Sequence, residues 1–452
     1  MHNRIAHGLA DCGTLFAALL VFAGYCGAQT PAPALTTLHT FVNGASDGIV
    51  PQGVAVGSGG VIYGTTARGG ASGYGTVFSL TPPAVGLSGA WTETVLYSFT
   101  GRSDGGGPLS VAIGKDGVLY GTTAAGGAQD LGTVFSLTTN GMFNSLVSFD
   151  STRGAYPSNG LVQATDGAFY GTAASGGTNG GWGTVFRLTA DGTLTPLHSF
   201  NYEDGAYPVG GLVQATDGNL YGTTSQGGIG GGTVFQITTK GLLTTLVWFN
   251  GPNGANPQGA LIQARDGSFY GTAEFGRTGY YNGASGSGDG LVFRLTLPLF
   301  LSNPFTQASG TATAPYSASL STNAVTPAGD VLTFAKVSGP AWLSVASDGT
   351  LSGIPAVGDI GANVFTVSLA DTNGWSSTAT MTITVLPLPS ISLSTQGTNM
   401  VLNWSGGQPP YSVQMATNLA GAAWQTIAGP MTNTTLLVTP SNAAAFYRIQ
   451  AQ

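Results

Sequence analysis

The sequence predicts an all-β protein: a five-bladed β-propeller closed by an N-terminal strand and followed by two small β-sandwich modules. Two observations predict this fold class. Three short motifs recur together five times across residues 35–297, which is typical of a repeat architecture. In addition, only 7% of the 452 residues are charged, against roughly 25% in an average soluble protein, and 73 are glycine. Few charges and many turn-forming glycines favour short strands over helices.

The same composition excludes several classes of protein. A coiled coil, an ordinary helical enzyme and a basic nucleic-acid binder all need many more charged residues. The 12 Lys and Arg residues against 19 Asp and Glu residues give a net charge of −7, which offers no basic surface to nucleic acid or anionic lipid. We therefore expect no nucleic-acid partner.

Residues 1–28 have the pattern of a secretory signal peptide. Arg4 precedes an apolar run at 15–23, and small residues follow that run. An uncleaved N-terminal anchor and a lipid attached to Cys26 are the alternatives. Both cysteines of the chain, Cys12 and Cys26, lie inside this segment, so the mature protein is expected to have no disulfide. No later stretch reaches the roughly 20 apolar residues of a membrane span, so we expect a secreted or cell-surface protein, with the periplasm also open.

The repeated unit contains three motifs in a fixed order. The first, Tyr-Gly-Thr, begins at Tyr63, Tyr120, Tyr170, Tyr221 and Tyr270. The second, Gly-Thr-Val-Phe, ends at Phe78, Phe135, Phe186 and Phe235 and returns in altered form at Phe293. The third, of the type Leu-x-Ser-Phe, ends at Phe41, Phe99, Phe149, Phe200 and Phe249. The motifs therefore divide residues 35–297 into five copies of one unit.

One copy, residues 211–249, shows the order of the elements. A short apolar run ends at the turn-forming pair Asp217-Gly218, and the Tyr-Gly-Thr strand follows. A glycine-rich loop leads to a third strand in which apolar and polar residues alternate, and residues 243–249 form a fourth. Four hairpin-connected strands make an antiparallel blade, and a ring of five such blades is a β-propeller.

The two ends of the repeat region are complementary. The fifth copy supplies only three strands, and the missing fourth strand has its counterpart in residues 35–41. We predict that this segment pairs with the fifth blade and closes the ring, because closure removes an exposed sheet edge. An open β-solenoid built from the same units is the alternative.

The three motifs resemble the GloVer tandem repeat, which is named for Gloeobacter and Verrucomicrobia. The resemblance covers residues 35–297 and is satisfied by each of the five copies. It implies a bacterial cell-surface protein, often with a C-terminal sorting anchor, and it brings no established activity. The chain departs from that pattern because residues 446–452 contain no apolar tail or basic stop. This departure favours release outside the cell or into the periplasm over anchorage.

After an expected linker at 297–304, strands rich in Thr, Ser, Ala and Val follow. Residues 305–386 suit a small sandwich and, through stretches such as 370–374, resemble the Ig or cadherin-like domain of bacterial surface proteins. Some cadherin-like relatives bind calcium through Asp and Asn, and Asp371 and Asn373 match that stretch. Because calcium takes six to eight ligands, a turn is the preferred interpretation of these two residues, and we expect no cofactor.

Residues 390–452 follow a proline-rich hinge and contain five or more further strand patterns. They are similar to the fibronectin type III-like tails of secreted verrucomicrobial proteins. We interpret this module, like the preceding one, as a spacer.

Candidate catalytic residues are few. Turn formation explains the aspartates that precede glycine at one repeated position, without a metal: Asp116, Asp166, Asp217 and Asp266. Glycoside hydrolysis needs two carboxylates at a set separation, and the chain has only three glutamates, Glu93, Glu203 and Glu274, at different positions in their repeats. His39 and His198 share one repeat position, which argues for a half-exposed strand rather than a catalytic base or a metal site.

A binding surface is therefore the favoured interpretation. In a four-stranded blade, the loop after the second strand and the crossover to the next blade emerge on the same face, which we call the loop face. Loops on a rigid scaffold commonly carry function, and exposed aromatic side chains are able to stack on sugar rings or anchor protein partners. The alternative is that these aromatic residues only pack the glycine-rich loops. The candidate residues are Tyr74, Tyr156, Trp182, Tyr202, Tyr207, Phe275, Tyr280 and Tyr281.

The sequence thus leads to three hypotheses. The first is a monomeric, secreted or cell-surface binding and adhesion protein whose loop face binds a polysaccharide or a surface protein. The second is a carbohydrate-active hydrolase that uses Glu203 or Glu274 with a nearby Asp. The third is a structural component of a surface layer or matrix, which associates with copies of itself.

Overall fold

The computed structural model describes residues 36–42, 44, 47–84, 89–276, 290–326, 330–372, 375–406, 410–417, 423–439 and 445–451. These residues form strands connected by turns, with three short 3-10 helices and no α-helix among them. The 3-10 helices are η1 (Ser58–Gly60), η2 (Ser321–Asn323) and η3 (Val357–Asp359). The prediction of an all-β protein is therefore confirmed. The predicted signal peptide at 1–28 lies outside the described residues.

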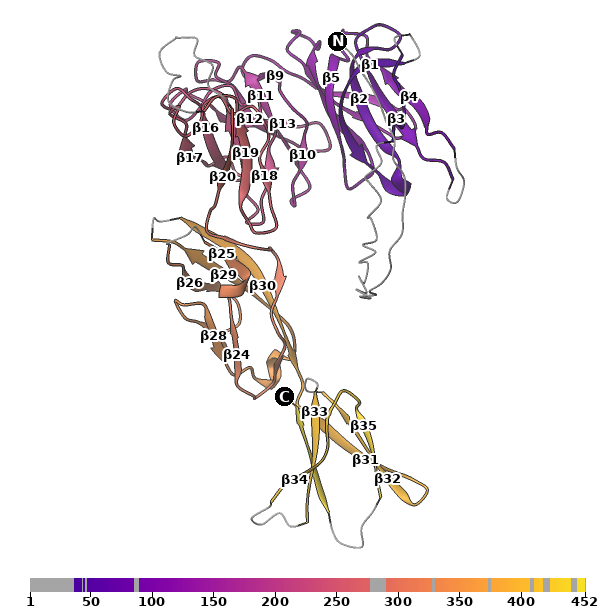
Figure 1. Cartoon of the computed structure of the whole chain (residues 1–452), viewed down its shortest axis with the longest axis vertical. Helices are drawn as coiled ribbons and strands as arrows, with labels where there is room; N and C mark the ends of the chain where they lie inside the picture. Colours follow the sequence, from indigo (N-terminus) through magenta and orange to yellow (C-terminus); the bar gives the residue numbers. More distant parts are fainter. Residues whose placement is uncertain are drawn as a thin grey trace, which may run out of the picture.

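The repeat region forms five antiparallel sheets, one for each copy of the unit (Figure 1). The first contains β1 (Gly48–Val56), β2 (Ile62–Gly69), β3 (Thr76–Thr81) and β4 (Thr92–Ser98). The second contains β5 (Gly106–Ile113), β6 (Leu119–Ala125), β7 (Thr133–Leu137) and β8 (Phe143–Ser148). The third contains β9 (Ala155–Pro157), β10 (Val162–Gln163), β11 (Phe169–Ser175), β12 (Thr184–Leu188) and β13 (Leu194–Ser199). The fourth contains β14 (Val213–Gln214), β15 (Leu220–Thr224), β16 (Thr233–Ile237) and β17 (Leu243–Trp248), and the fifth β18 (Ile262–Gln263), β19 (Phe269–Ala273) and β20 (Leu291–Leu295).

The Tyr-Gly-Thr and Gly-Thr-Val-Phe motifs occur together because they pair across neighbouring strands. Gly171 of β11 lies opposite Phe186 of β12. A Cβ atom at Gly171 would lie 2.5 Å from Cζ of Phe186, so only glycine leaves room for the phenyl ring. The other repeats contain the same pair: Gly64 and Phe78, Gly121 and Phe135, Gly222 and Phe235, Gly271 and Phe293.

Aromatic pairs join consecutive sheets at contacts that we call seams. Phe149, which follows β8, contacts Phe186 of the third sheet edge to face, with ring centroids 5.3 Å apart. The pairs Phe99 and Phe135, Phe200 and Phe235, and Phe249 and Phe293 repeat this contact at 5.2–5.3 Å. Phe149 and Phe186 are both buried, so the third motif of one copy and the second motif of the next share one core.

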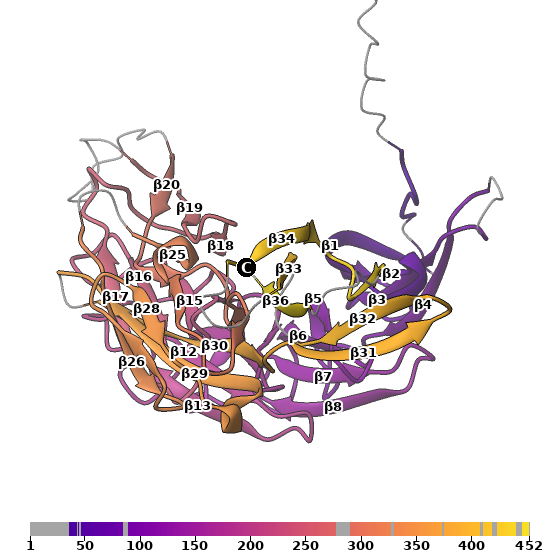
Figure 2. The same ribbon diagram turned by 90° about the horizontal axis from the view of Figure 1, so that it is seen from below.

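The predicted closure of the ring is not formed. Residues 36–42 are not in a strand, and β20 pairs with β19 alone among the described strands. Figure 2 shows the five sheets along an arc, with a gap between β1–β4 and β18–β20. Because the arc stops short of a full turn, residues 36–42 reach only the first sheet, where Phe41 contacts Phe78 edge to face at 5.0 Å. The segment thus makes the same Phe–Phe contact as the third motif of the other repeats, while its pairing with the fifth sheet is absent from the described residues.

The open end of the array exposes a residue that is buried in every other repeat. Val292 of β20 is 75% exposed, because no fourth strand covers the outer edge of β20 among the described residues. Its counterparts are completely buried: Val77, Val134, Val185 and Val234. An uncovered edge of this kind is available for pairing with another chain.

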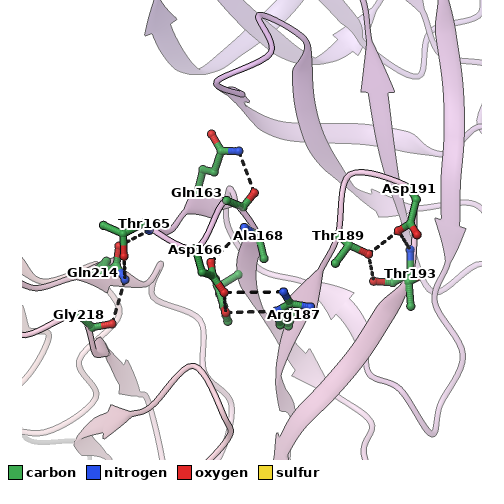
Figure 3. Close-up of polar contacts among 12 residues, drawn as sticks. Gln163, Thr165, Asp166, Ala168, Arg187, Thr189, Asp191, Thr193, Gln214 and Gly218 are labelled. Carbon is green, nitrogen blue, oxygen red and sulfur yellow. Dashed lines mark hydrogen bonds and ion pairs between the residues drawn. The ribbon is translucent and has the colours of Figure 1, made fainter.

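The opposite end of each sheet, which we call the turn face, carries the Asp-Gly turns, and a row of glutamines links these turns from repeat to repeat. Thr165 donates its backbone N–H to Oε1 of Gln214 at 2.8 Å, and Nε2 of Gln214 donates to the carbonyl of Gly218 at 2.9 Å (Figure 3). Gln163 and Gln263 accept the corresponding backbone bonds at the neighbouring seams. Each glutamine therefore ties its own turn to the turn of the preceding repeat.

Two sheets of an Ig-like sandwich follow the repeats. The larger sheet contains β22 (Phe305–Thr306), β23 (Gly310–Thr311), β26 (Thr333–Ser338), β29 (Gly361–Ala370) and β30 (Ser376–Leu386). The smaller contains β24 (Tyr316–Ser319), β27 (Leu343–Val345) and β28 (Thr350–Gly353). Phe334 and Phe365 of the larger sheet form one buried cluster with Leu343 and Leu351 of the smaller. A separate short pair is formed by β21 (Leu299–Phe300) and β25 (Ala324–Val325).

The segment predicted as a linker, residues 297–304, is packed onto the array. Leu297 and Leu299 are buried in one cluster with residues of the last two repeats. In addition, the hydroxyl of Thr216 donates to the carbonyl of Phe300 at 2.7 Å. The sandwich is therefore attached to the end of the array by side chains as well as by the backbone.

The C-terminal module consists of two three-stranded sheets. One contains β31 (Ser390–Gln396), β32 (Asn399–Ser405) and β35 (Thr435–Val438), and the other β33 (Tyr411–Ala416), β34 (Gln425–Met431) and β36 (Phe446–Ala451). Leu402 and Trp404 of the first sheet cluster with Tyr411 and Val413 of the second, so the module has its own core.

Candidate ligand-binding surface

The loop after the second strand and the crossover to the next repeat meet on one face, as the sequence predicts. Tyr207, which precedes Pro208 in a crossover, donates its backbone N–H to the carbonyl of Trp182 at 2.8 Å. The same bond joins Gly107 to Tyr74, Tyr156 to Leu131, and Asn256 to Gly231, at 2.8–2.9 Å. Each seam therefore places one loop residue and one crossover residue side by side on the loop face.

The crossover position before the proline has a backbone conformation that favours glycine and asparagine. Its φ angle lies between +54° and +61° in all five repeats. Gly107 and Asn256 adopt this conformation readily, whereas for Tyr156 and Tyr207 it costs roughly 1–2 kcal/mol. Two repeats thus keep a tyrosine, and the first repeat keeps Val50, where the backbone disfavours such residues. Strain of this kind is concentrated at functional sites.

Trp182, Tyr202 and Tyr207 form one aromatic cluster at the seam between the third and fourth sheets. The Trp182 ring contacts the rings of Tyr202 and Tyr207 edge to face, with centroid distances of 4.9 and 5.7 Å. Tyr202 is 38% exposed and has a φ of +74°, while Trp182 and Tyr207 are half-buried. The contacts hold the rings in place and leave part of their surface accessible. Such rigid, amphipathic rings are suited to binding a ligand that has both apolar and polar surfaces.

The other predicted aromatic residues occupy neighbouring places on the loop face. Tyr156 is 49% exposed at the preceding seam, and Tyr74 is 50% exposed at the seam before that. Phe275 is half-buried where the chain leaves β19. Tyr280 and Tyr281 lie outside the described residues. Of the eight predicted residues, the structure brings three into one cluster and places three more on the same face.

The structure has two shallow grooves beside the loop face that the sequence did not predict. One, with a volume of about 310 Å³, is lined by Thr152, Thr178, Asn179 and residues 196–199. The other, of about 290 Å³, occupies the equivalent place in the preceding repeat and is lined by Ala128, Gln129, residues 146–150, Arg153 and Gly192. Each groove lies between the glycine-rich loop and the fourth strand of its repeat. Their amide and hydroxyl groups could form hydrogen bonds with a polar ligand.

One charged pair lines the groove of the second repeat. Nε of Arg153 lies 2.7 Å from Oδ2 of Asp150. A hydrogen bond from the Thr152 hydroxyl, followed by bonds and charge from Arg153 that outweigh the effect of burial, lowers the pKa of Asp150 to about 2. Asp150 is therefore a carboxylate at any physiological pH.

The carboxylates considered for a hydrolase have local partners. Oε2 of Glu274 accepts hydrogen bonds from the side-chain amides of Asn256 and Gln258, the latter at 2.5 Å. Glu203 lies in an exposed turn and donates its backbone N–H to Oδ1 of Asn201 at 3.0 Å. The glutamates thus lie in separate loops of successive repeats, and no contact between them is seen among the described residues.

The repeated aspartates close turns, as predicted. Asp166 accepts the backbone N–H of Ala168 at 3.0 Å (Figure 3) and the hydroxyl of Tyr170 at 2.7 Å. Asp371, considered for calcium, accepts the backbone N–H of Trp375 at 2.8 Å, which is also a turn contact. Its proposed companion Asn373 lies outside the described residues.

An array of β-sheet repeats followed by an Ig-like sandwich defines a modular, all-β repeat protein. The family model described as Gloeobacter/Verrucomicrobia repeat matches residues 23–181 and 158–335, and the one described as "Putative Ig domain" matches residues 298–386. The chain belongs to the Gloeobacter/Verrucomicrobia repeat family. The resemblances to the repeat and to an Ig domain are thereby confirmed, while the cadherin-like and fibronectin type III-like resemblances stay predictions. A search of curated proteins finds no match.

Similar solved structures are distant. A gluconolactonase from Xanthomonas campestris is 18% identical, with a TM-score of 0.35 over 52% of this chain and 72% of its own. A PL25 polysaccharide lyase, an ulvan lyase, is 11% identical, with a TM-score of 0.33 over 82% of both chains. An endo-fucoidan hydrolase of glycoside hydrolase family 107 is 18% identical, with a TM-score of 0.20 over 67% of this chain and 42% of its own. Likeness at this level carries no functional argument. Among the described residues, no helix is long and apolar enough to cross a membrane.

Proposed function

We propose that the protein is a secreted or cell-surface binding protein whose loop face holds a polysaccharide, with the two sandwich modules as spacers. The observation that carries this proposal is the cluster of Trp182, Tyr202 and Tyr207, in which both tyrosines keep a positive φ. Gly107 and Asn256 hold the equivalent position in two other repeats with less strain, whereas Val50 holds it in the first repeat at a similar cost.

A neutral or weakly charged polysaccharide is the class of ligand that fits this surface. A sugar ring has an apolar face of C–H groups, which suits the rings of the cluster, and hydroxyl groups at its edge. Polar groove residues such as Asn179 and Gln129 supply hydrogen-bonding partners for these hydroxyls. The net charge of −7 disfavours a polyanion through repulsion.

The repetition of the surface supports a polymer over a single sugar. The two grooves occupy equivalent places in consecutive repeats, and aromatic residues occur at three consecutive seams. Repeat arrays present extended surfaces of this kind, which bind extended ligands along their length.

Retention on a panel of insoluble polysaccharides, with the supernatants assayed for released sugar, tests this function. Trp182→Ala and Tyr207→Asn are each expected to weaken retention about tenfold, as expected for an aromatic anchor. Tyr207→Asn is the sharper variant, because Asn256 shows that asparagine is compatible with that position. Gln214→Ala, on the turn face, is the matched control and should bind as the unmodified protein does.

The possible outcomes distinguish the binding function from the hydrolase and test the loop face as the binding surface. Retention without release, weakened in both aromatic variants, supports the binding function. Released sugar, lost in Glu203→Gln or Glu274→Gln, supports the hydrolase in its place. Unchanged retention in Trp182→Ala and Tyr207→Asn rules out the loop face as the binding surface.

A second candidate, a structural protein that associates with itself, is favoured by the uncovered edge of β20. Val292 lies exposed on that edge, and uncovered strands pair readily with other chains. Sedimentation velocity over a hundredfold concentration range tests this candidate. Association that disappears in Val292→Lys supports it, and a monomer at every concentration contradicts it.

A further inference from the structure

His39, Asp47 and Glu93 come together at the N-terminal end of the array, away from the aromatic cluster. They belong to three segments: residues 36–42, the turn before β1, and β4. One ligand atom from each lies within 4.8 Å of the other two, and Nε2 of His39 is 3.7 Å from Oδ2 of Asp47. In the described part of the chain, no second group of three His, Cys, Asp or Glu side chains is this close.

The other repeats show which member of this group is unusual. His39 and Asp47 correspond to Tyr97 and Asp104, whose side chains are hydrogen-bonded at 3.0 Å. A polar pair at this place is therefore a feature of the repeat. Glu93 is the addition, because its counterparts, six residues before the terminal Phe of the third motif, are apolar: Phe143, Leu194 and Leu243.

The contact that Glu93 replaces is an apolar one. At the next seam, Phe143 stacks on Tyr97 with the ring centroids 4.0 Å apart. At the first seam, the same two positions bring the carboxylate of Glu93 to the imidazole of His39. A carboxylate in place of an apolar core residue breaks the symmetry of the array at one seam.

Two polar atoms of this group are buried without a hydrogen-bond partner. They are Nε2 of His39 and Oε1 of Glu93, two of four such side-chain atoms among the described residues. Asp47 is held in place, because its two oxygens accept the backbone N–H groups of Val42 at 2.7 Å and Gly48 at 2.6 Å. Burial, and after it the charge of Asp47, raises the pKa of Glu93, while His39 acts in the opposite direction. Buried polar atoms without a hydrogen-bond partner are rare, and a bound ion or water is one arrangement that satisfies them.

We propose that His39, Asp47 and Glu93 bind one Zn²⁺ ion. An imidazole nitrogen and carboxylate oxygens are ligands that zinc takes, and a water molecule completes four-coordination. The ion supplies a partner for both orphaned atoms, and its two positive charges balance the two carboxylates. Calcium fits poorly, because it takes six to eight oxygen ligands.

The geometry is close to that of a zinc site. Around a tetrahedral Zn²⁺ bonded at about 2.0–2.1 Å, neighbouring ligand atoms lie about 3.3 Å apart. The 3.7 Å between His39 and Asp47 needs only a small adjustment, and the long side chain of Glu93 supplies the larger part of the movement. The imidazole is oriented by an edge-to-face contact with Phe41 at 4.7 Å.

The bound ion fastens residues 36–42 to the first sheet. His39 comes from that segment, whereas Asp47 and Glu93 belong to the first repeat. The ion therefore acts with the contact of Phe41 on Phe78 to cap the array, whose end repeats need covering. This role goes beyond polysaccharide binding and is independent of it.

Calorimetric titration of ZnCl₂ into the EDTA-treated protein tests the proposal, together with thermal unfolding and hydrogen exchange of residues 36–42. One ion should bind per chain. At a free Zn²⁺ concentration of about one hundred times Kd, the unfolding equilibrium constant should fall about a hundredfold, and exchange at 36–42 should slow. His39→Ala and Glu93→Leu should each weaken binding at least about tenfold, since even residues behind the ligands are worth that much.

Two variants separate the loss of a zinc ligand from the loss of the fold. Glu93→Leu restores the residue type of Leu194 and Leu243, so the variant is expected to fold. His198→Ala removes the histidine at the equivalent position of another repeat and should leave zinc binding unchanged. Absence of zinc binding, a preference for CaCl₂ over ZnCl₂, or equal affinity in Glu93→Leu would each overturn the proposal.

Discussion

Replacing Phe186 by alanine removes one ring of an internal seam and measures how strongly the repeats depend on one another. Phe186 is buried between Phe149 of the preceding repeat and Gly171 of its own sheet. Loss of a buried phenylalanine leaves a cavity and typically costs about 3–5 kcal/mol. We expect Phe186→Ala to lie in this range, because the glycine beneath the ring offers no side chain to fill the space.

Phe293→Ala is the matched control at the open end. Phe293 occupies the same motif position and covers Gly271, but it is only half-buried because no fourth strand covers β20 among the described residues. Less apolar surface returns to water when this ring is removed, so we expect a cost of about 1–2 kcal/mol. The cost of Phe186→Ala should therefore exceed that of Phe293→Ala by about 1 kcal/mol or more.

Urea unfolding followed by circular dichroism, with hydrogen exchange read repeat by repeat, measures both variants. The exchange data are needed because repeat arrays unfold in parts as well as globally. Equal destabilisation by the two substitutions would refute the reasoning. It would mean that Phe293 is covered in solution, as in the closed propeller predicted from the sequence.

Three further predictions follow from other parts of the molecule. Gln214→Ala should lower the free energy of unfolding in urea by about 1 kcal/mol, because the backbone N–H of Thr165 then has only water as a partner. A loss below a few tenths of a kcal/mol would show that the row of glutamines does not stabilise the array. Tyr156→Asn should change the unfolding free energy by less than about 1 kcal/mol while weakening retention on polysaccharide, since the loss of ring contacts is offset by relief of the positive φ. Burial, followed by the hydrogen bond and charge of Asp116, raises the pKa of Tyr120 to about 12. The folded state therefore holds the phenolic proton more tightly than the unfolded state does, so urea midpoints should fall from about pH 10 towards pH 12, and less steeply in Tyr120→Phe.

The strands and turns within a repeat were predictable from the sequence, because the motifs that form them occur in five copies. The fourth strand expected at 243–249 is β17 (Leu243–Trp248), and the aspartates before glycine close turns as expected. The placement of Trp182 and Tyr207 on one face also follows from strand order alone, because antiparallel strands return each second loop to the same end. These predictions rest on contacts within a repeat or between adjacent repeats.

Features that depend on long separations were missed. Residues 35–41 do match the sequence of a fourth strand. Their pairing with β20 also depends on how far the arc of sheets turns, however, and the side-chain packing at the seams sets that angle. The group of His39, Asp47 and Glu93 left a signal that aligning the copies would have shown. A glutamate stands there at a position that is otherwise apolar.

The most direct test of the central claim is hydrogen–deuterium exchange with and without the polysaccharide that best retains the protein. Exchange should slow at residues 176–183 and 201–208, which contain Trp182, Tyr202 and Tyr207, and should stay unchanged in the Asp-Gly turns of the turn face. Protection confined to the turn face or to the sandwich modules would contradict the proposal that the loop face binds the ligand.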